Sequence, residues 1–194
     1  MLERELSIRS EANIGWRLKS QEHRGPETGV IRQKDIDIEI DYGTSFSGVA
    51  FAIYPRQRRE LHISTISDWP HSHSCHRASQ RVPSYVGNDS EGNVSCGFDI
   101  TGECQRLKWV KLLLETEYDE GKATLLQAEE VVNSREQLKR LGETPVEAAA
   151  DYLWWLWRVV CEAVVEDQRD LELLAHSDTM VMFSVPAMWS DTSK

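Results

Sequence analysis

Apolar and polar side chains alternate over residues 36–42, where isoleucines at every second position are separated by acidic residues and then a tyrosine ends the run. A period of two is typical of a β-strand with one buried face. Two more apolar runs follow at residues 49–54 and 61–66, and a short turn that begins with Pro55 separates them. Because short connections make consecutive strands neighbours, this pattern predicts a three-stranded meander.

A second group of short strands is predicted further along the chain. Residues 82–86 form a short run whose proline restricts it to a strand start or a sheet edge. Residues 88–92 have the composition of a turn, and residues 93–99 can return as a strand that closes a second hairpin. The last apolar run, residues 179–185, is nearly continuous, which is typical of a strand buried on both faces.

Helical spacing is found in two segments. Over residues 106–118, the apolar side chains share one side, while Lys108 and Lys111 lie on the opposite, wetter side. Residues 144–167 begin with threonine, proline and an early glutamate, which is typical of a helix N-terminus. Apolar positions at three- and four-residue steps then predict a broad buried face. These positions are Val146, Ala149, Ala150, Leu153, Trp157, Val160 and Val164.

The chain is expected to form one folded unit, residues 35–194, preceded by a polar tail. Residues 1–34 contain few large apolar side chains, so burial would not offset the entropy lost on ordering them, and we expect a disordered tail. Residues 119–143 are rich in charge. They predict a helical or flexible insertion that packs loosely on the surface.

Composition narrows the class of protein. The net charge of −10 argues against a general nucleic-acid or anionic-membrane binder, which would need a basic face. The four cysteines show no CxxC spacing, so a reducing compartment is expected. No apolar run approaches the ~20 residues that span a bilayer, and the N-terminus lacks the apolar stretch of a secretory signal. We therefore expect a cytoplasmic protein.

Two clusters invite a functional interpretation. The first comprises His71, His73, Cys75 and His76, with Cys96 and Cys104 further along the chain. Such side chains could bind zinc, but their spacing matches no standard zinc module, so a solvent loop is favoured. The tryptophan-rich run at residues 154–157 could stack on a carbohydrate, but aromatic residues at helical spacing favour a core.

The turn between the first two predicted strands carries the clearest candidate chemistry. Gly43, Thr44 and Ser45 can direct backbone amides and hydroxyls at a phosphate. Asp41, at the end of the first strand, could orient a hydrated Mg²⁺ beside that phosphate. A turn of this composition is more often only a hairpin connection, so both interpretations stay open on these residues alone.

A set of segments in a particular order resembles the ATPase domain of the heat-shock protein 70 (Hsp70) family, a branch of the actin-like ATPases, and especially its divergent fungal members. The segments are I-D-Y-G-T-S-F-S at 40–47, V-P-S-Y-V at 82–86, G-F-D-I at 97–100, L-K-W-V-K-L-L at 107–113 and S-V-P-A-M-W-S-D at 184–191. The resemblance spans residues 36–194. It implies an α/β fold with a ribonuclease H-like βββαβ lobe whose last strand runs parallel to the first.

The resemblance also implies a ligand, ATP or ADP with Mg²⁺. Gly43, Thr44 and Ser45 would contact the β- and γ-phosphates through backbone amides and hydroxyls. Asp41 would hold waters of a phosphate-bound Mg²⁺, and Phe46 would stand where the family commonly has a tyrosine. Co-chaperones and unfolded client proteins are the partners that such a chaperone would have.

Some positions depart from the family pattern. Glu39 stands where the family usually has glycine. Thr101 occupies the place of a lysine that helps to position the attacking water, and Lys108 is the nearest substitute in the sequence. The resemblance corresponds to the first quarter to third of the ATPase domain, and the second phosphate loop and second lobe have no counterpart here. Because hydrolysis needs groups from both lobes, we expect this fragment to be inactive as an ATPase.

Two other functions compete with nucleotide binding. A catalytically inactive remnant of the same fold could act as a protein-interaction module. A ribonuclease H-like nuclease could use Asp41 with two metal ions, but a convincing second and third acid are missing from neighbouring elements, and the acidic net charge disfavours it.

Overall fold

The computed structural model describes residues 34–55, 62–72, 79–88, 93–100, 105–114, 127–168, 174 and 177–184. The predicted tail lies outside these ranges except for Lys34, which begins the first strand. Thr101 and four of the proposed zinc ligands, His73, Cys75, His76 and Cys104, also lie outside them. Among the helices that the structure describes, none is long and apolar enough to cross a membrane.

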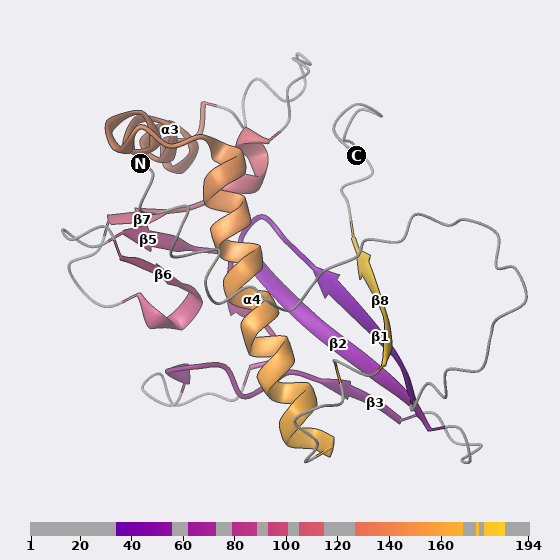
Figure 1. Cartoon of the computed structure of the whole chain (residues 1–194). Helices are drawn as coiled ribbons and strands as arrows, with labels where there is room; N and C mark the ends of the chain where they lie inside the picture. Colours follow the sequence, from indigo (N-terminus) through magenta and orange to yellow (C-terminus); the bar gives the residue numbers. More distant parts are fainter. Residues whose placement is uncertain are drawn as a thin grey trace, which may run out of the picture.

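The central sheet contains the predicted meander (Figure 1). Its main path has the order β3-β2-β1-β8, formed by β1 (Lys34–Asp41), β2 (Phe46–Pro55), β3 (His62–Thr65) and β8 (Asp178–Phe183). The first three strands pair antiparallel, which confirms the meander. β8 lies beside β1 and runs parallel to it, as predicted for a strand that follows a helical crossover. The fold is therefore mixed α/β.

A smaller sheet lies at one end of the molecule. It has the order β6-β5-β7, with β5 (Val86–Asn88), β6 (Val94–Cys96) and β7 (Gln105–Leu107). β5 and β6 pair antiparallel, so a second hairpin does form, but its strands differ from the predicted ones. Of the strand predicted at residues 82–86 only Val86 belongs to the hairpin, and of the strand predicted at 93–99 the last three residues form a 3₁₀ turn, η2 (Gly97–Asp99). Just before β5, β4 (Val82–Pro83) pairs with the start of β2 and so joins the two sheets.

The prediction of a helix over residues 106–118 is wrong for residues 106–114, the part that the structure describes. These residues contain the end of β7 and then η3 (Val110–Leu113), a single 3₁₀ turn. Trp109, between them, has a φ of +56°, a left-handed conformation that a right-handed helix does not contain. Leu107 and Val110 are nevertheless buried, so their spacing reflects contact with the core and not helical structure.

The long helix is confirmed as α4 (Pro145–Gln168), which crosses the central sheet in Figure 1. Its predicted N-terminal cap is present: Oε2 of Glu147 accepts a hydrogen bond from the backbone N–H of Thr144 at 2.7 Å. In return, Oγ1 of Thr144 accepts one from the backbone N–H of Glu147 at 3.2 Å. These two bonds satisfy amide groups that would otherwise have no partner within the helix.

The buried side of α4 differs from the predicted one. Its fully buried residues are Ala148, Ala149, Tyr152, Leu156, Val159, Val160 and Val164. Val146 and Ala150 are exposed, which corrects two of the predicted positions. Apolar residues occur on nearly every side of this helix, so periodicity alone did not select the side that contacts the sheet. Tyr152 marks that side, because its ring stacks on Tyr42 at 5.5 Å between centroids.

The tryptophan-rich run of α4 is only partly core. Leu156 is fully buried and Trp155 is half-buried, whereas Trp154 is exposed. The ring of Trp155 stacks on Trp69 at 6.3 Å, and its Nε1–H donates to Oδ2 of Asp99 at 2.9 Å. The prediction that this run belongs to the core is thus correct for the residues on the side of α4 that faces the rest of the protein.

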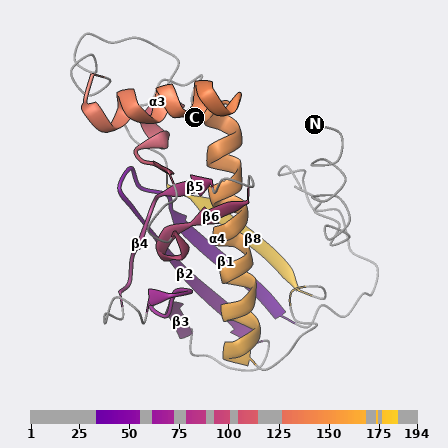
Figure 2. The ribbon, with the colours of Figure 1, turned by 90° about the vertical axis from the view of Figure 1, so that its left-hand side faces the viewer.

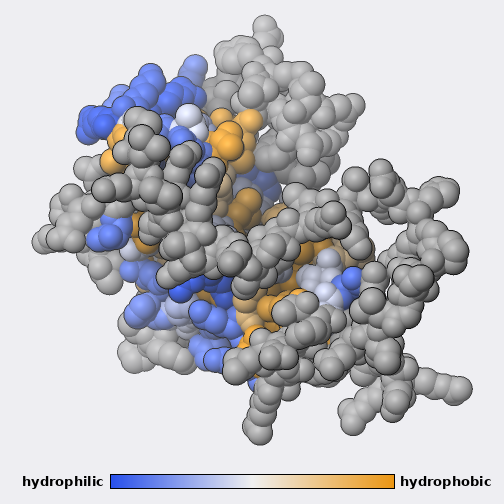
Figure 3. Space-filling model, in the orientation of Figure 1, coloured by the Kyte–Doolittle hydropathy of each residue, from blue (hydrophilic) through white to orange (hydrophobic). Residues whose placement is uncertain are grey.

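The charged insertion contains a second helix, α3 (Glu129–Leu141). Figure 2 shows α3 across one end of α4, and Figure 3 shows that its outward surface is strongly hydrophilic. Its inner side is packed more closely than predicted, since Val131, Ser134 and Leu138 are buried. The hydroxyl of Ser134 both donates to the carbonyl of Lys108 at 2.8 Å and accepts from its N–H at 2.9 Å.

β8 corrects the prediction of a strand buried on both faces. Met180, Met182 and Phe183 are 52%, 42% and 51% exposed. Among the described strands, β8 pairs with β1 alone and therefore forms the edge of the sheet. An edge strand with one uncovered face keeps apolar side chains in contact with solvent.

Candidate functional site

The turn between β1 and β2 brings the predicted phosphate-binding residues together. β1 ends at Asp41 and β2 begins at Phe46, so Gly43, Thr44 and Ser45 lie in the tight connection. A Cβ added at Gly43 would overlap the carbonyl oxygen of Phe46. Only glycine permits this close approach of backbone to backbone. Thr44 and Ser45 are partly exposed and Phe46 is 47% exposed, so the turn opens to solvent.

Hydrogen bonds from the segment that contains β4 and from α4 stabilise the turn. The backbone N–H of Ser84 donates to the carbonyl of Ser45 at 2.9 Å. The hydroxyl oxygens of Ser47 and Ser84 are 2.8 Å apart and both side chains are buried. From α4, the hydroxyl of Tyr152 donates to the carbonyl of Pro83 at 3.2 Å. Because buried hydrogen bonds fix the backbone on both sides, the turn has a supported conformation.

A buried lysine reaches the turn from the side of the core. Lys111, on η3, is only 6% exposed, and its Nζ donates a hydrogen bond to the carbonyl oxygen of Tyr42. The same ammonium lies 5.2 Å from the centre of the Tyr42 ring. Burial lowers the pKa of Lys111, and the nearby negative charge of Asp41 partly opposes this shift. The turn therefore has a positive charge directly behind it.

Asp41 faces the other side of the same turn. Its Oδ1 accepts a hydrogen bond from the hydroxyl of Ser184 at 2.7 Å, and its Oδ2 lies 3.7 Å from Nη2 of Arg81. The Asp41 side chain is 48% exposed, so water reaches the carboxylate. A half-exposed carboxylate beside a glycine turn suits contact with a hydrated cation, because such a cation binds through its water molecules.

Three residues at this site are not among the predicted site residues. The sequence places Lys111 on the wet side of a helix that does not form. Ser184 lies in the predicted last strand and opens a segment of the family resemblance, but nothing in the sequence links it to Asp41, and Arg81 is marked only by its position before a short apolar run. Lys108, the proposed substitute for the family lysine, lies elsewhere: its Nζ pairs with Oε1 of Glu130 on α3 at 2.8 Å and lies over the ring of Tyr85.

The proposed zinc cluster is represented by two of its members. Nδ1 of His71 is 2.8 Å from Oδ1 of Asp99, so this histidine is oriented by a carboxylate. The thiol of Cys96 is buried, and burial raises its pKa, which disfavours the thiolate that binds metal. Within the part of the chain that the structure describes, no three such side chains are grouped to hold a metal ion.

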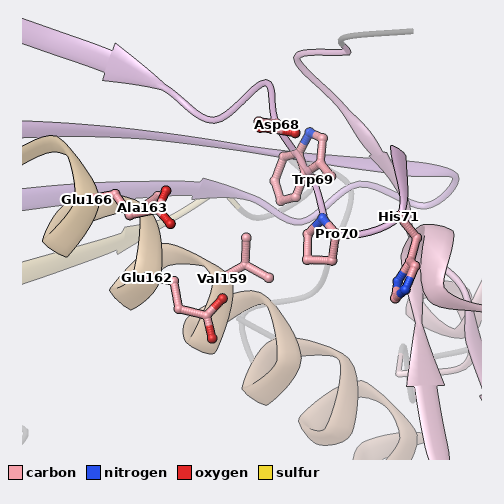
Figure 4. A pocket seen from close by; sticks show the side chains of 8 residues that line it. All are labelled: Asp68, Trp69, Pro70, His71, Val159, Glu162, Ala163 and Glu166. Atoms are coloured by element: carbon pink, nitrogen blue, oxygen red, sulfur yellow. The ribbon is translucent and has the colours of Figure 1, made fainter. Parts of the chain in front are cut away.

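A shallow pocket of about 220 Å³ lies away from the turn (Figure 4). Trp69, Pro70 and His71 form one wall, and Glu162 and Glu166 of α4 lie opposite. Carboxylates repel phosphate groups, so this pocket does not suit a nucleotide phosphate. The turn at residues 41–47 is the stronger candidate site.

No protein-family model matches this sequence, and comparison with curated proteins gives no significant match.

Proposed function

We propose that the turn from Asp41 to Ser47 binds the phosphates of ATP or ADP, in a lobe related to the Hsp70-like, actin-like ATPases. The observation that carries this proposal is the buried ammonium of Lys111, bonded to the Tyr42 carbonyl directly behind the glycine turn. This ammonium already donates to a carbonyl, and its positive charge would also attract an anion bound on the outer side of the turn. A bound phosphate is such an anion.

The strand order supports the finer assignment of a ribonuclease H-like lobe. The antiparallel β1, β2 and β3 are followed by the crossover helix α4 and by β8, parallel to β1. This is the βββαβ order that the family resemblance implies. Fold similarity alone does not establish function, so the nucleotide assignment depends on the turn.

The roles of the residues follow from their positions. Backbone amides of Gly43, Thr44 and Ser45 and the two hydroxyls would donate to phosphate oxygens. Asp41 would accept hydrogen bonds from the water shell of Mg²⁺, which would neutralise part of the phosphate charge when bound. Lys111 would hold the carbonyl of Tyr42 away from the phosphate and add positive charge. The proposal concerns binding and assigns no catalytic residue.

Acidic residues near the turn make the metal important. Glu39 is exposed two residues before Asp41 on the same face of β1. Carboxylates so close would repel a free triphosphate, whereas its Mg²⁺ complex carries less negative charge. We therefore expect the Mg²⁺ complex of the nucleotide to bind much more tightly than the free nucleotide.

Thermal unfolding with different ligands tests the proposal. A ligand that binds only the native state raises the melting temperature, with ~2.7 kcal/mol of stabilisation at a concentration 100 times its Kd. We expect a rise with millimolar Mg-ATP, Mg-ADP and Mg-tripolyphosphate, and none with adenosine. An unchanged midpoint with all three phosphate ligands would overturn the proposal, and an equal rise with adenosine would exclude the phosphate contact.

A pair of lysine variants locates the binding site. Lys111→Met removes the cation behind the turn but keeps a long apolar side chain, and it should greatly reduce the rise in melting temperature. Lys108→Met is the matched control, because it lies three residues earlier and pairs with Glu130. It should retain the full rise. Circular dichroism of both variants would verify that each is folded.

The face of the central sheet opposite α4 favours a second candidate function, a protein-interaction module. Met180, Met182 and Ile63 are 52%, 42% and 63% exposed on that sheet. Exposed apolar side chains grouped on one surface are typical of a contact with another protein. This candidate does not depend on nucleotide binding.

A further inference from the structure

The central sheet has one face that no described element covers. α4 packs on the face that carries Ile36, Ile38 and Ile40 of β1, all of which are buried. Because side chains alternate along a strand, Asp37, Glu39 and Asp41 point to the opposite face. These three carboxylates form an acidic row along β1.

Apolar and small residues flank the acidic row on both sides. In the strand register, Asp37 lies between Ala52 of β2 and Met180 of β8. Glu39 lies between Ala50 and Met182 in the same way. Further out, Ile63 of β3 is paired with Ala52. We call this surface the open face, defined by Asp37, Glu39, Asp41, Ala50, Ala52, Ile63, Met180 and Met182.

The shape and the residue composition of the open face suit the docking of a helix. Ala50 and Ala52 of β2 have small side chains, and Ala52 is buried, so the surface is low between the acidic row and Ile63, which is 63% exposed. The two methionines have flexible side chains that adapt to varied partners. Helices are the elements that ordinarily cover a sheet face, as α4 does on the other side.

The acidic row determines what charge the helix must carry. Asp41 already contacts Ser184 and Arg81, and Asp37 has a hydrogen bond with the side chain of Tyr54. Covering Glu39 and Asp37 with a purely apolar helix would still bury carboxylates that have no cationic partner, which is costly. Residues two apart on a strand are ~6.6 Å apart along it. Residues four apart on a helix are ~6 Å apart along its axis. A helix lying along β1 with Arg or Lys at every fourth position would therefore meet one carboxylate per turn.

We propose that the open face is a docking surface for an amphipathic helix of another protein, with Arg or Lys at four-residue spacing within an apolar stripe. The inference develops the second candidate function and does not require nucleotide binding, although the open face shares Asp41 with the turn. The net charge of −10 adds long-range attraction for a cationic segment. A second copy of this chain is disfavoured, because two acidic rows would then face each other.

Fluorescence anisotropy with a defined peptide tests the proposal. The probe is a labelled 18-residue helical peptide with arginine at every fourth position in a leucine stripe; its control has glutamine in place of each arginine. We expect saturable binding of the arginine peptide to the full chain and at least tenfold weaker binding of the glutamine peptide. Absence of saturation with the arginine peptide at 1 mM protein would overturn the proposal.

Charge-matched variants place the binding on the open face. Asp37→Asn with Glu39→Gln should weaken arginine-peptide binding at least tenfold. Glu162→Gln with Glu166→Gln removes the same charge from α4 and should change binding less than twofold. Equal losses in the two double variants would mean non-specific attraction and overturn the assignment. Sedimentation of the free chain should show a monomer, and a dimer that dissociates as peptide binds would assign the face to a second copy instead.

Peptide binding by the Lys111→Met variant separates this proposal from nucleotide binding. Lys111→Met should keep its affinity for the arginine peptide, because Lys111 approaches the turn from the core side. Loss of peptide binding in folded Lys111→Met would contradict an independent surface. Loss of the nucleotide effect alone would concern only the turn.

Discussion

The two faces of the central sheet use the same strands for different purposes. On the covered face, Ile36, Ile38 and Ile40 are 0%, 0% and 1% exposed and share one core with α4. On the open face, the intervening residues of β1 are acidic and the neighbouring methionines of β8 are about half exposed. One-residue alternation therefore separates the part of the sheet that stabilises the fold from the part that is free to contact other molecules.

The candidate phosphate turn lies where the two faces meet. Lys111 approaches it from the core side and donates to the Tyr42 carbonyl, while Asp41 lies on the open side. The candidate phosphate turn therefore also has two different sides: the buried ammonium of Lys111 lies on the core side, and the partly exposed carboxylate of Asp41 lies on the open side. Three comparisons between variants test these differences.

The largest expected effect compares two isoleucines of the sheet. Ile38→Ala removes a fully buried side chain from the covered face and should lower the free energy of unfolding by about 2–5 kcal/mol. Ile63→Ala, the same change at a residue 63% exposed, should lower it by less than about 0.5 kcal/mol. Urea unfolding of both variants gives the comparison. Similar losses at the two positions would show that the open face is covered in the folded protein.

A smaller effect is expected from two glycines near the turn. Gly43→Ala places a Cβ against the Phe46 carbonyl and should cost about 1–3 kcal/mol, because the backbone of the turn must shift. Gly48→Ala is the control: its Cβ would meet the carbonyl oxygen of Gln80 at 3.4 Å and Cγ of Arg81 at 3.9 Å, both ordinary contacts. That variant should be close to neutral. Thermal melts of both proteins measure the difference, and a tolerated Gly43→Ala would mean that the turn is not tightly built.

The smallest effect is a pH dependence that isolates Lys111. Its folded pKa is lowered below the ordinary lysine value of 10.5, so between these two values the unfolded chain binds more protons than the native one. Stability should therefore rise with pH in the native sequence relative to Lys111→Met, as pH increases toward 10.5. Urea unfolding at several pH values above neutral gives the difference. Parallel curves would show that Lys111 is hydrated in the native state as it is in the unfolded chain.

Several elements were predictable because their signals are local. Strict alternation identified β1, and the threonine–proline–glutamate cap identified the start of α4 to the residue. The glycine and hydroxyl residues located the turn between β1 and β2. Each of these signals depends on neighbouring residues in the chain, so it survives without knowledge of the rest of the fold.

Other features depended on contacts between distant segments. Leu107 and Val110 have helical spacing, yet a left-handed Trp109 separates a strand from a 3₁₀ turn. The apolar run of β8 resembled a strand buried on both faces, but among the described strands only β1 pairs with it, which leaves Met180 and Met182 exposed. Periodicity gives the order of apolar residues and not the surface that each one meets.

For this protein, the sequence by itself determined the three strands of the meander, the long helix and the last strand, together with the glycine turn and the alternation that makes β1 two-sided. Only the tertiary structure decided that Lys111 is buried behind Tyr42, that Arg81 and Ser184 flank Asp41, and which face of the sheet α4 leaves open. Local hydrogen bonding and side-chain alternation act over a few residues. The environment of a charge depends instead on segments up to 143 residues apart, as between Asp41 and Ser184.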